Sequence, residues 1–313
     1  MVIFEPSFGG GSALEHQNSH VGIYHPGFMG TPLLASITAH EIAHAWNVKR
    51  LRPAEMTPYR YDVPQPTTLL WVSEGITDYY ADLALVRSGV IDSTVFLNVT
   101  DGKRQQVDAK VPVALEDASL TTWIHPTDGT ADIYYDKGSL AGLLLDIQIR
   151  DASDNRKSLD DVMRSLYRST YKAGTGFTTA QWWAAVSAAA GGRSFADFSA
   201  RYIDGREPLP WRIVGPLAGI RYTADSVRVV RLGINTVGDS VPLTVISVIS
   251  GGAAARAGIE AGDELLKVGE IEVKDPDFGI AFRGRYGNAE GTTIPVVVRR
   301  GGVERTLQLV VRK

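Results

Sequence analysis

One short segment carries the residue types that a hydrolytic metal site needs. It reads His40-Glu41-Ile42-Ala43-His44, an H-E-x-x-H pattern. Residues four apart lie on one face of a helix, so His40 and His44 can direct imidazole nitrogens at one zinc ion. Glu41 would lie beside that ion, where its carboxylate can accept a proton from water. Such a short pattern also arises on ordinary solvated helices, so the interpretation depends on a third ligand elsewhere in the chain.

Residues 69–88 supply that candidate ligand. Their apolar residues recur at helical spacing and predict a second helix with one apolar stripe. Glu74 has apolar neighbours on both sides, which argues against a fully solvated position. Two histidines and one carboxylate would leave the fourth position of a tetrahedral zinc ion open for water. Asp78 follows one turn after Glu74, where it could accept a hydrogen bond from a ligand imidazole and fix its tautomer.

The elements that must position these residues are predicted from periodicity and from breaker residues. The zinc-binding helix is expected over residues 31–52, because Pro53 marks a stop. A proline-containing surface loop follows, and residues 89–130 are expected to be mostly loop, with Asp101-Gly102 forming a turn. Short β-like runs occupy residues 1–30, with a candidate edge strand over residues 12–19. Further helices are expected over residues 139–150, 159–171, 179–190 and 194–202.

The pattern changes from helical to β near residue 217, which indicates a second domain of strands and glycine-rich turns. The fold class is therefore α+β, with a mostly helical domain over residues 1–215 and a β-rich domain over residues 216–313. The expected strands cover residues 227–232, 242–249, 264–268, 293–299 and 304–312.

Composition narrows the function classes. The chain has 313 residues, a net charge of −3 and no long basic run, so nucleic acid is not an expected partner. It contains no cysteine, which excludes thiolate ligands, a cysteine nucleophile and disulfides. No apolar run is long enough to predict a membrane span, and no signal peptide is visible. These features leave the compartment undecided between cytoplasm and periplasm.

Several segments resemble one peptidase family. HEIAHAWNVKRLRP, from His40 to Pro53, resembles the extended zinc-helix motif of gluzincin metallopeptidases, and more closely that of the glycyl aminopeptidase family. WVSEGITDYYADL resembles its third-ligand helix, GGGSALEHQNS its upstream Gly-rich segment, and YYDKGSL the Tyr-x-Lys-Gly element of aminopeptidases. GGAAARAGIEAGDELLKVGE is similar to the core of bacterial PDZ domains. That family has a large β domain ahead of the Gly-rich segment, and only fourteen residues precede Glu15 here.

The resemblance implies a thermolysin-like catalytic domain with a small N-terminal β portion, followed by a PDZ domain. It implies a zinc aminopeptidase that prefers small first residues, Gly or Ala. Tyr135 would donate a hydrogen bond to the oxyanion, although Tyr134 lies next to it, and Glu15 would bind the substrate's amino terminus. The segment Leu232-Gly233-Ile234 would form the carboxylate-binding loop for a C-terminal peptide. From the residues alone, Glu15 could instead be an exposed strand carboxylate, and Gly233 could be an ordinary turn glycine.

Two other functions fit the same sequence. One is a zinc endopeptidase of thermolysin type whose PDZ domain selects protein substrates. The other is an adaptor without activity that binds partners through the PDZ domain. Peptides are the expected partners in each case, as substrates or as ligands.

Overall fold

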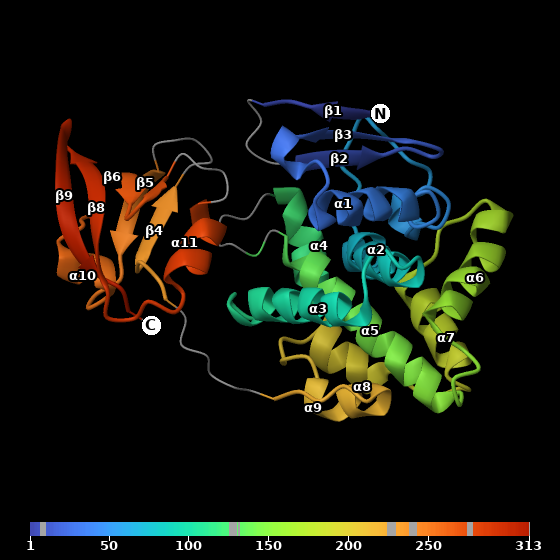
Figure 1. Ribbon diagram of the computed structural model, residues 1–313. Helices are drawn as coiled ribbons and strands as arrows, with labels where there is room; N and C mark the ends of the chain where they lie inside the picture. Colours follow the sequence, from blue (N-terminus) through green and yellow to red (C-terminus); the bar gives the residue numbers. More distant parts are fainter. Residues whose placement is uncertain are drawn as a thin grey trace. The chain divides into compact units, whose positions relative to one another are not determined.

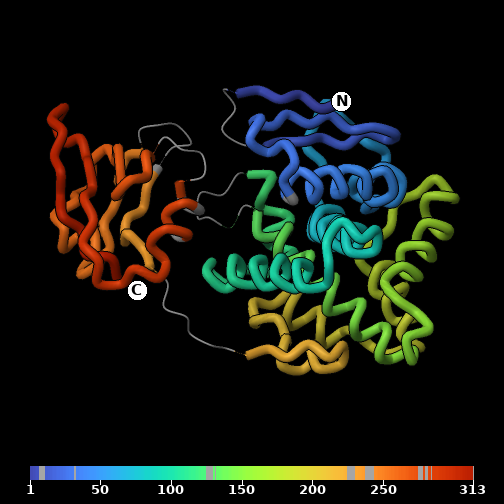
Figure 2. Tube along the Cα trace, in the orientation of Figure 1, coloured from blue at the N-terminus to red at the C-terminus, as the bar shows by residue number. Residues whose placement is uncertain are grey.

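The computed structural model describes residues 1–6, 11–124, 130, 132–223, 230–237, 243–273 and 278–312. The chain divides into two compact units, Met1–Thr223 and Ala224–Lys313, and each is described by itself (Figures 1 and 2). Residues 227–229 of the strand expected over residues 227–232 lie outside the described residues, as do Gly9 and Gly10, and the other three, 230–232, are not in a strand because β4 begins only at Ile234. None of the described helices is both long and apolar enough to cross a bilayer.

The first unit opens with a small sheet that covers α1. Its strands are β1 (Val2–Phe4), β2 (Gly11–Glu15) and β3 (His20–Tyr24), in the order β1-β3-β2. β1 and β3 are parallel, whereas β2 and β3 are antiparallel and place Glu15 opposite His20. β2 is an edge strand, as expected for this segment, and it packs against α1 (Figure 1).

Helices build the rest of this unit around the long, buried α5. Its core includes Trp71, Phe177 and Trp182, all with no exposed surface. The helices are α1 (Pro32–Ala43), α2 (Ile76–Arg87), α3 (Ser93–Asp108), α4 (Leu115–Thr121), α5 (Ile133–Ala152), α6 (Leu159–Ser169), α7 (Thr179–Ala189), α8 (Ala196–Phe198) and α9 (Trp211–Val214). Two π-helical turns, Trp71–Gly75 and Ser199–Ile203, lie directly before α2 and directly after α8.

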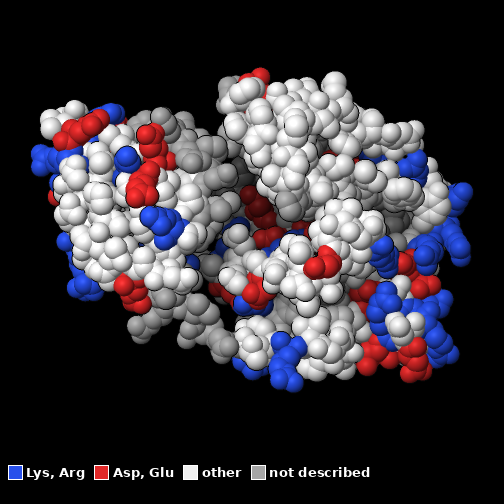
Figure 3. All heavy atoms as spheres, in the orientation of Figure 1, with Lys and Arg blue, Asp and Glu red and all other residues white. Residues whose placement is uncertain are grey.

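Charged residues of both signs are interspersed on the face drawn in Figure 3, most densely around α6. Lys157 and Arg164 pair there with Asp161 and Asp160, each across one helical turn. Such exposed pairs contribute little to stability, so packing of the apolar faces holds this helix in place.

The prediction that residues 89–130 are mostly loop, with a turn at Asp101-Gly102, is wrong, because α3 runs through both residues. Asp92 caps this helix, since its carboxylate accepts a hydrogen bond from the Val95 N–H at 2.8 Å. A helical glycine costs only about 1 kcal/mol relative to alanine. Packing of Phe96 and Val107 against the main core outweighs that cost.

The zinc-binding helix is shorter than expected, because α1 ends at Ala43 and residues 44–51 form irregular turns. In a continued helix, the Asn47 carbonyl would accept a hydrogen bond from Leu51. Instead the Asn47 carbonyl accepts a hydrogen bond from the His44 ring. The side-chain amide of Asn47 donates to the Val72 carbonyl at 2.7 Å. Tertiary hydrogen bonds therefore override local helix propensity at this point.

Two glycines let α5 approach the π-helical turn before α2. A Cβ added to Gly75 would lie 2.5 Å from the Gly138 Cα and 2.6 Å from the Tyr134 carbonyl oxygen. Neither is a flexible side-chain atom, so the backbones would have to separate. This close approach places the first turn of α5, which carries Tyr135, beside Glu74.

Gly75→Ala is expected to destabilise the first unit by about 1–3 kcal/mol, the usual cost of overpacking a tight contact. Gly102→Ala is the matched control, because its Cβ would meet nothing within 4 Å. That control should gain about 0.5–1 kcal/mol from lower unfolded-state entropy. Urea unfolding followed by tryptophan fluorescence measures both, since all six tryptophans lie in the first unit. Equal stability of the two variants would contradict the close-approach argument.

The second unit is a sheet with two helices. Its strands follow the order β4-β5-β6-β8-β9, and β7 pairs with β6. They are β4 (Ile234–Val237), β5 (Leu243–Val248), β6 (Glu264–Val268), β7 (Ile271–Glu272), β8 (Thr293–Arg300) and β9 (Val303–Val310). The helices are α10 (Ala253–Ala257) and α11 (Phe278–Tyr286).

A buried ion pair fixes the turn before β6. Asp263 is 1% exposed, and its two carboxylate oxygens accept hydrogen bonds from Arg300 at 2.7 and 2.8 Å. The Glu260 N–H donates to the same carboxylate at 2.9 Å. Hydrogen bonds from Arg300 hold the pKa of Asp263 below its usual value despite burial.

Candidate active site

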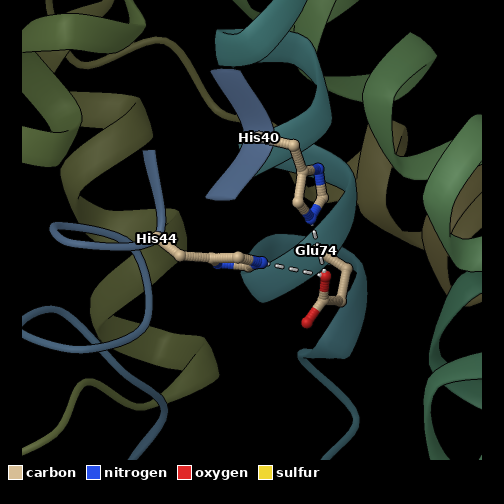
Figure 4. Close-up of side chains that lie close together, drawn as sticks. All are labelled: His40, His44 and Glu74. Carbon is tan, nitrogen blue, oxygen red and sulfur yellow. Dashed lines mark hydrogen bonds and ion pairs between the residues drawn. The ribbon is translucent and has the colours of Figure 1, made fainter. Parts of the chain in front are cut away.

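His40, His44 and Glu74 converge at one point (Figure 4). One Glu74 carboxylate oxygen, Oε2, lies 3.2 Å from His40 Nε2 and 3.3 Å from His44 Nε2. The candidate ligand atoms of all three residues lie within 4.8 Å of one another. The histidines come from the end of α1 and the glutamate from the π-helical turn, so two separate segments form this cluster. π-helical turns are often found at functional sites.

The outer ring nitrogens of both histidines also have partners. His40 Nδ1 lies 3.2 Å from Asp78 Oδ1, and His44 Nδ1 lies 2.7 Å from the Asn47 carbonyl oxygen. Both partners are acceptors, so each Nδ1 can donate a proton to its partner when Nε2 gives its lone pair to a metal. Each Nε2 faces the same Glu74 oxygen, so the two rings present the same nitrogen to one point.

The charges in this cluster influence one another strongly. Burial alone would lower the pKa of His40, but hydrogen bonds to Asp78 and Glu74 outweigh it and raise the pKa to about 10. Burial would raise the pKa of Glu74, but the two histidines hold it well below its usual value. The cluster therefore favours a positive charge between the imidazoles and the carboxylate.

Glu41 lies next to this cluster without belonging to it. The residue is 7% exposed, and its Oε2 is a buried atom without a hydrogen-bond partner among the described residues. Burial raises the pKa of Glu41, and His44 and His40 partly offset that effect. A buried carboxylate oxygen without a partner is costly, which suits a group that must accept a proton from bound water.

Tyr135 faces the ligand cluster from the first turn of α5. Its ring centroid lies 5.9 Å from that of His40. Burial and the nearby Glu74 carboxylate raise the pKa of the Tyr135 hydroxyl far above its usual value. The hydroxyl therefore keeps its proton at neutral pH and can act as a donor. Tyr134 lies beside it, with the two ring centroids 4.8 Å apart.

Glu15 lies at the end of β2 and forms an ion pair that the sequence did not suggest. Its Oε1 is 3.0 Å from Lys49 Nζ. Both side chains line a cavity of about 460 Å³, which Tyr59 and Trp123 also line. Glu15 is thus placed at a pocket, but with its charge already offset by a lysine.

Sequence reasoning did not identify three residues around this site. Asn47 and Thr77 are buried beside His44, and Lys103 contacts Asp78. Asn47 lies within the HEIAHAWNVKR segment, so its position close to His44 was a usable signal. Lys103 had none, because residues 89–130 were expected to be loop.

The candidate carboxylate-binding segment lies at the start of β4 in the second unit. Gly233 has a φ of 79°, a left-handed conformation that favours glycine. Its carbonyl accepts a hydrogen bond from the Ile249 N–H at 2.8 Å, and the Leu232 carbonyl accepts one from the Ala254 N–H at 2.9 Å. These bonds fix the turn that leads into Ile234 and the edge strand.

The first cluster fits a zinc ion by the chemistry of its donors. Two imidazole nitrogens and one carboxylate oxygen form the ligand set of many catalytic zinc sites. Both imidazoles have an acceptor at Nδ1, which suits ligation through Nε2, and Glu41 Oε2, which has no hydrogen-bond partner in the described part of the chain, belongs to the neighbouring residue of the same helix.

Two segments of the chain match known protein families. Residues 34–141 match the M61 glycyl aminopeptidase family, and residues 230–311 match the PDZ domain family. These matches confirm the resemblance seen in the sequence and support a peptidase. The first match contains His40, His44, Glu74 and Tyr135. A search of proteins with curated functions found no match.

One solved structure shows the same fold over the whole chain. The crystal structure of an aminopeptidase N family protein from Idiomarina loihiensis is similar over 100% of this chain and 58% of that chain, at 22% identity and a TM-score of 0.70. This likeness confirms the expected α+β fold, and the chain spans little more than half of that protein. A serine endoprotease from Yersinia pestis is 29% identical over 27% of this chain and 29% of its own, with a TM-score of 0.23.

Proposed function

We propose that this chain, which joins a segment of the M61 glycyl aminopeptidase family to a PDZ domain, is a zinc-dependent aminopeptidase. The observation that carries the proposal is the convergence of two imidazole nitrogens and a carboxylate oxygen within 4.8 Å, with Glu41 beside them. The family match supports a peptidase, and the donor set supports zinc.

Each residue has a separate role in this proposal. His40, His44 and Glu74 hold the zinc ion, which supplies Lewis-acid chemistry when bound. Glu41 accepts a proton from the attacking water and passes it to the leaving amine. Tyr135 donates a hydrogen bond to the oxygen that becomes negative in the transition state. Asp78 and the Asn47 carbonyl hold the two imidazoles in their working tautomer.

Substrate selection is the second part of the proposal. Glu15 accepts hydrogen bonds from the free α-ammonium group of the peptide, so cleavage occurs one residue from that end. The preference for Gly or Ala as first residue follows from the family resemblance.

Zinc analysis combined with an anilide assay tests the function. Purified protein is expected to contain about one zinc ion per chain, the stoichiometry of a three-ligand catalytic site. It should also hydrolyse Gly- and Ala-anilides. Protein that binds no zinc, or that binds zinc and hydrolyses neither anilide, would contradict the proposal.

Glu15→Ala is expected to lower kcat/KM for peptides with a free amino terminus by roughly 10–100-fold, the value of one charge-assisted hydrogen bond. N-acetylated peptides should be affected by less than about threefold, because they carry no ammonium group for Glu15 to bind. Rates on matched free and acetylated peptides measure this difference. An equal loss on both would remove the argument for cleavage at the amino terminus.

A zinc endopeptidase is the second candidate, and the ion pair of Glu15 with Lys49 favours it. A carboxylate already paired at 3.0 Å must release or share that partner before it can bind an ammonium group. Internal cleavage of N-acetylated peptides would support this alternative.

The PDZ domain is proposed to bind an extended peptide. β4 lies at the end of the described sheet and pairs only with β5 there, so its other edge can accept a further strand. The turn Leu232-Gly233-Ile234 at the start of β4 is placed to receive a terminal carboxylate.

A further inference from the structure

A partly buried lysine outside the ligand set contacts the carboxylate that supports His40. Lys103 extends from α3, and its Nζ lies 2.6 Å from Asp78 Oδ2 and 2.6 Å from Asp82 Oδ2. It also donates to Ser139 Oγ on α5 at 3.0 Å. An ammonium group has three protons, and these acceptors use all of them. Only 13% of the lysine side chain is exposed, so water does little to screen these contacts.

Lys103 fixes the orientation of Asp78. One carboxylate oxygen of Asp78 faces His40 Nδ1 at 3.2 Å, and the other faces Lys103 Nζ. Rotation of the carboxylate would break both hydrogen bonds, and both involve a charged group. The imidazole of His40 is therefore oriented by a carboxylate that is itself held from the opposite side.

The lysine also balances charge on this face of α2. Asp78 and Asp82 lie one helical turn apart, with side chains 18% and 6% exposed. Two buried carboxylates at this spacing repel each other. Lys103 lies within hydrogen-bonding distance of both and offsets that repulsion, so Asp78 remains close enough to His40 to accept its hydrogen bond.

We propose that Lys103 is a positioning residue for the zinc site, which acts on His40 through Asp78. This inference rests on the proposed zinc-dependent function. Among the described residues, Lys103 bonds to Asp78, Asp82 and Ser139 and to none of the three ligands, and its effect is to keep His40 Nε2 directed at the metal. If Lys103 only joined α2, α3 and α5, its removal would lower stability and leave the zinc affinity of the folded protein unchanged.

Zinc affinity of the full chain, measured by competition with a chelator, tests the proposal. Lys103→Met is expected to raise the zinc Kd by roughly 10–100-fold, the usual effect of losing support for a ligand histidine. Arg104→Met is the matched control, because Arg104 also pairs with two carboxylates, Asp101 and Asp108, on the same helix. The ion pairs of Arg104 do not involve a residue that contacts a ligand, so the zinc Kd of Arg104→Met should stay within about twofold of wild type.

A charge-balanced variant covers the case in which Lys103→Met does not fold. Lys103→Met combined with Asp82→Asn removes one cation and one anion together. This double variant should still show about a tenfold higher Kd, whereas Asp82→Asn alone should stay within about threefold of wild type. A wild-type Kd in the double variant would overturn the proposal.

A double-mutant cycle with Asp78→Asn shows whether the effect passes through Asp78. If it does, Lys103→Met adds little to the Kd of Asp78→Asn, because the connecting carboxylate is already gone. Full additivity of the two effects would overturn the proposed route. Absence of zinc from the wild-type protein is a different result, since it would overturn the proposed function itself.

Discussion

Glu41→Gln should lower kcat by about 10²–10⁴-fold, the usual contribution of a general base, while the protein keeps its zinc. The structure gives a reason why hydrolysis should be lost while zinc binding is kept. Glu41 is not one of the three convergent ligands, and its Oε2 has no partner among the described residues. Glutamine has nearly the same size and shape, so packing around α1 should be preserved. Its amide cannot take up the proton that a carboxylate removes from water.

Anilide hydrolysis and zinc content are to be measured on the same protein sample. Glu55→Gln is the matched control, because Glu55 is exposed and bonds to Thr67 and Gln65, away from the ligand cluster. It should retain wild-type kcat. If Glu41→Gln retains more than about a tenth of the wild-type rate, the general-base assignment is wrong. Loss of zinc from that variant would instead indicate that Glu41 supports the metal.

The ligand cluster could be predicted because its geometry is mostly local. His40 and Glu41 lie on α1, and His44 caps its end with helical backbone angles, so spacing alone decides which side chains share a face. Glu74 could be added because its apolar neighbours indicated an inward position. What the helical pattern did not reveal is the π-helical turn that carries Glu74. That turn lies where α5 packs closely, and the pairing of Gly75 with Gly138 is a tertiary contact.

The residues that support the ligands could not be predicted either, because their positions also depend on tertiary contacts. Asn47 leaves the helical path because its carbonyl accepts a hydrogen bond from the His44 ring and its side-chain amide donates to the Val72 carbonyl of another segment. Lys103 lies in a stretch whose Asp-Gly pair suggested a turn, and only the packed structure shows a helix there. The ion pair of Glu15 with Lys49 depends on how β2 packs near the end of α1, which neither segment encodes by itself.

In the second unit, alternating strands were easier to predict than short helices. β5, β6, β8 and β9 lie within two residues of their expected bounds. α10 was missed because its alanines fall between glycines, which suggested only a turn. α11 was missed because its glycines and aromatic residues give no clear helical stripe.

Tyr135→Phe is expected to lower kcat by about 10²–10³-fold, the cost of losing one oxyanion hydrogen bond in a dry site. Tyr135 keeps its proton because burial and Glu74 raise the pKa of its hydroxyl, so the wild-type residue is a donor throughout the neutral range. The change removes one oxygen atom and leaves the ring in place. KM should change little, since the lost hydrogen bond forms mainly in the transition state.

The neighbouring tyrosine provides a control within the same helical turn. Tyr134 is also buried, at 7% exposure, but its ring packs in the main core. Tyr134→Phe should therefore keep kcat within about threefold of wild type, because it removes no donor from the transition state. Steady-state kinetics on Ala-anilide with both variants decides between the two tyrosines. A large loss in Tyr134→Phe with a small one in Tyr135→Phe would move the donor role to Tyr134, and equal small losses would mean that neither hydroxyl stabilises the oxyanion.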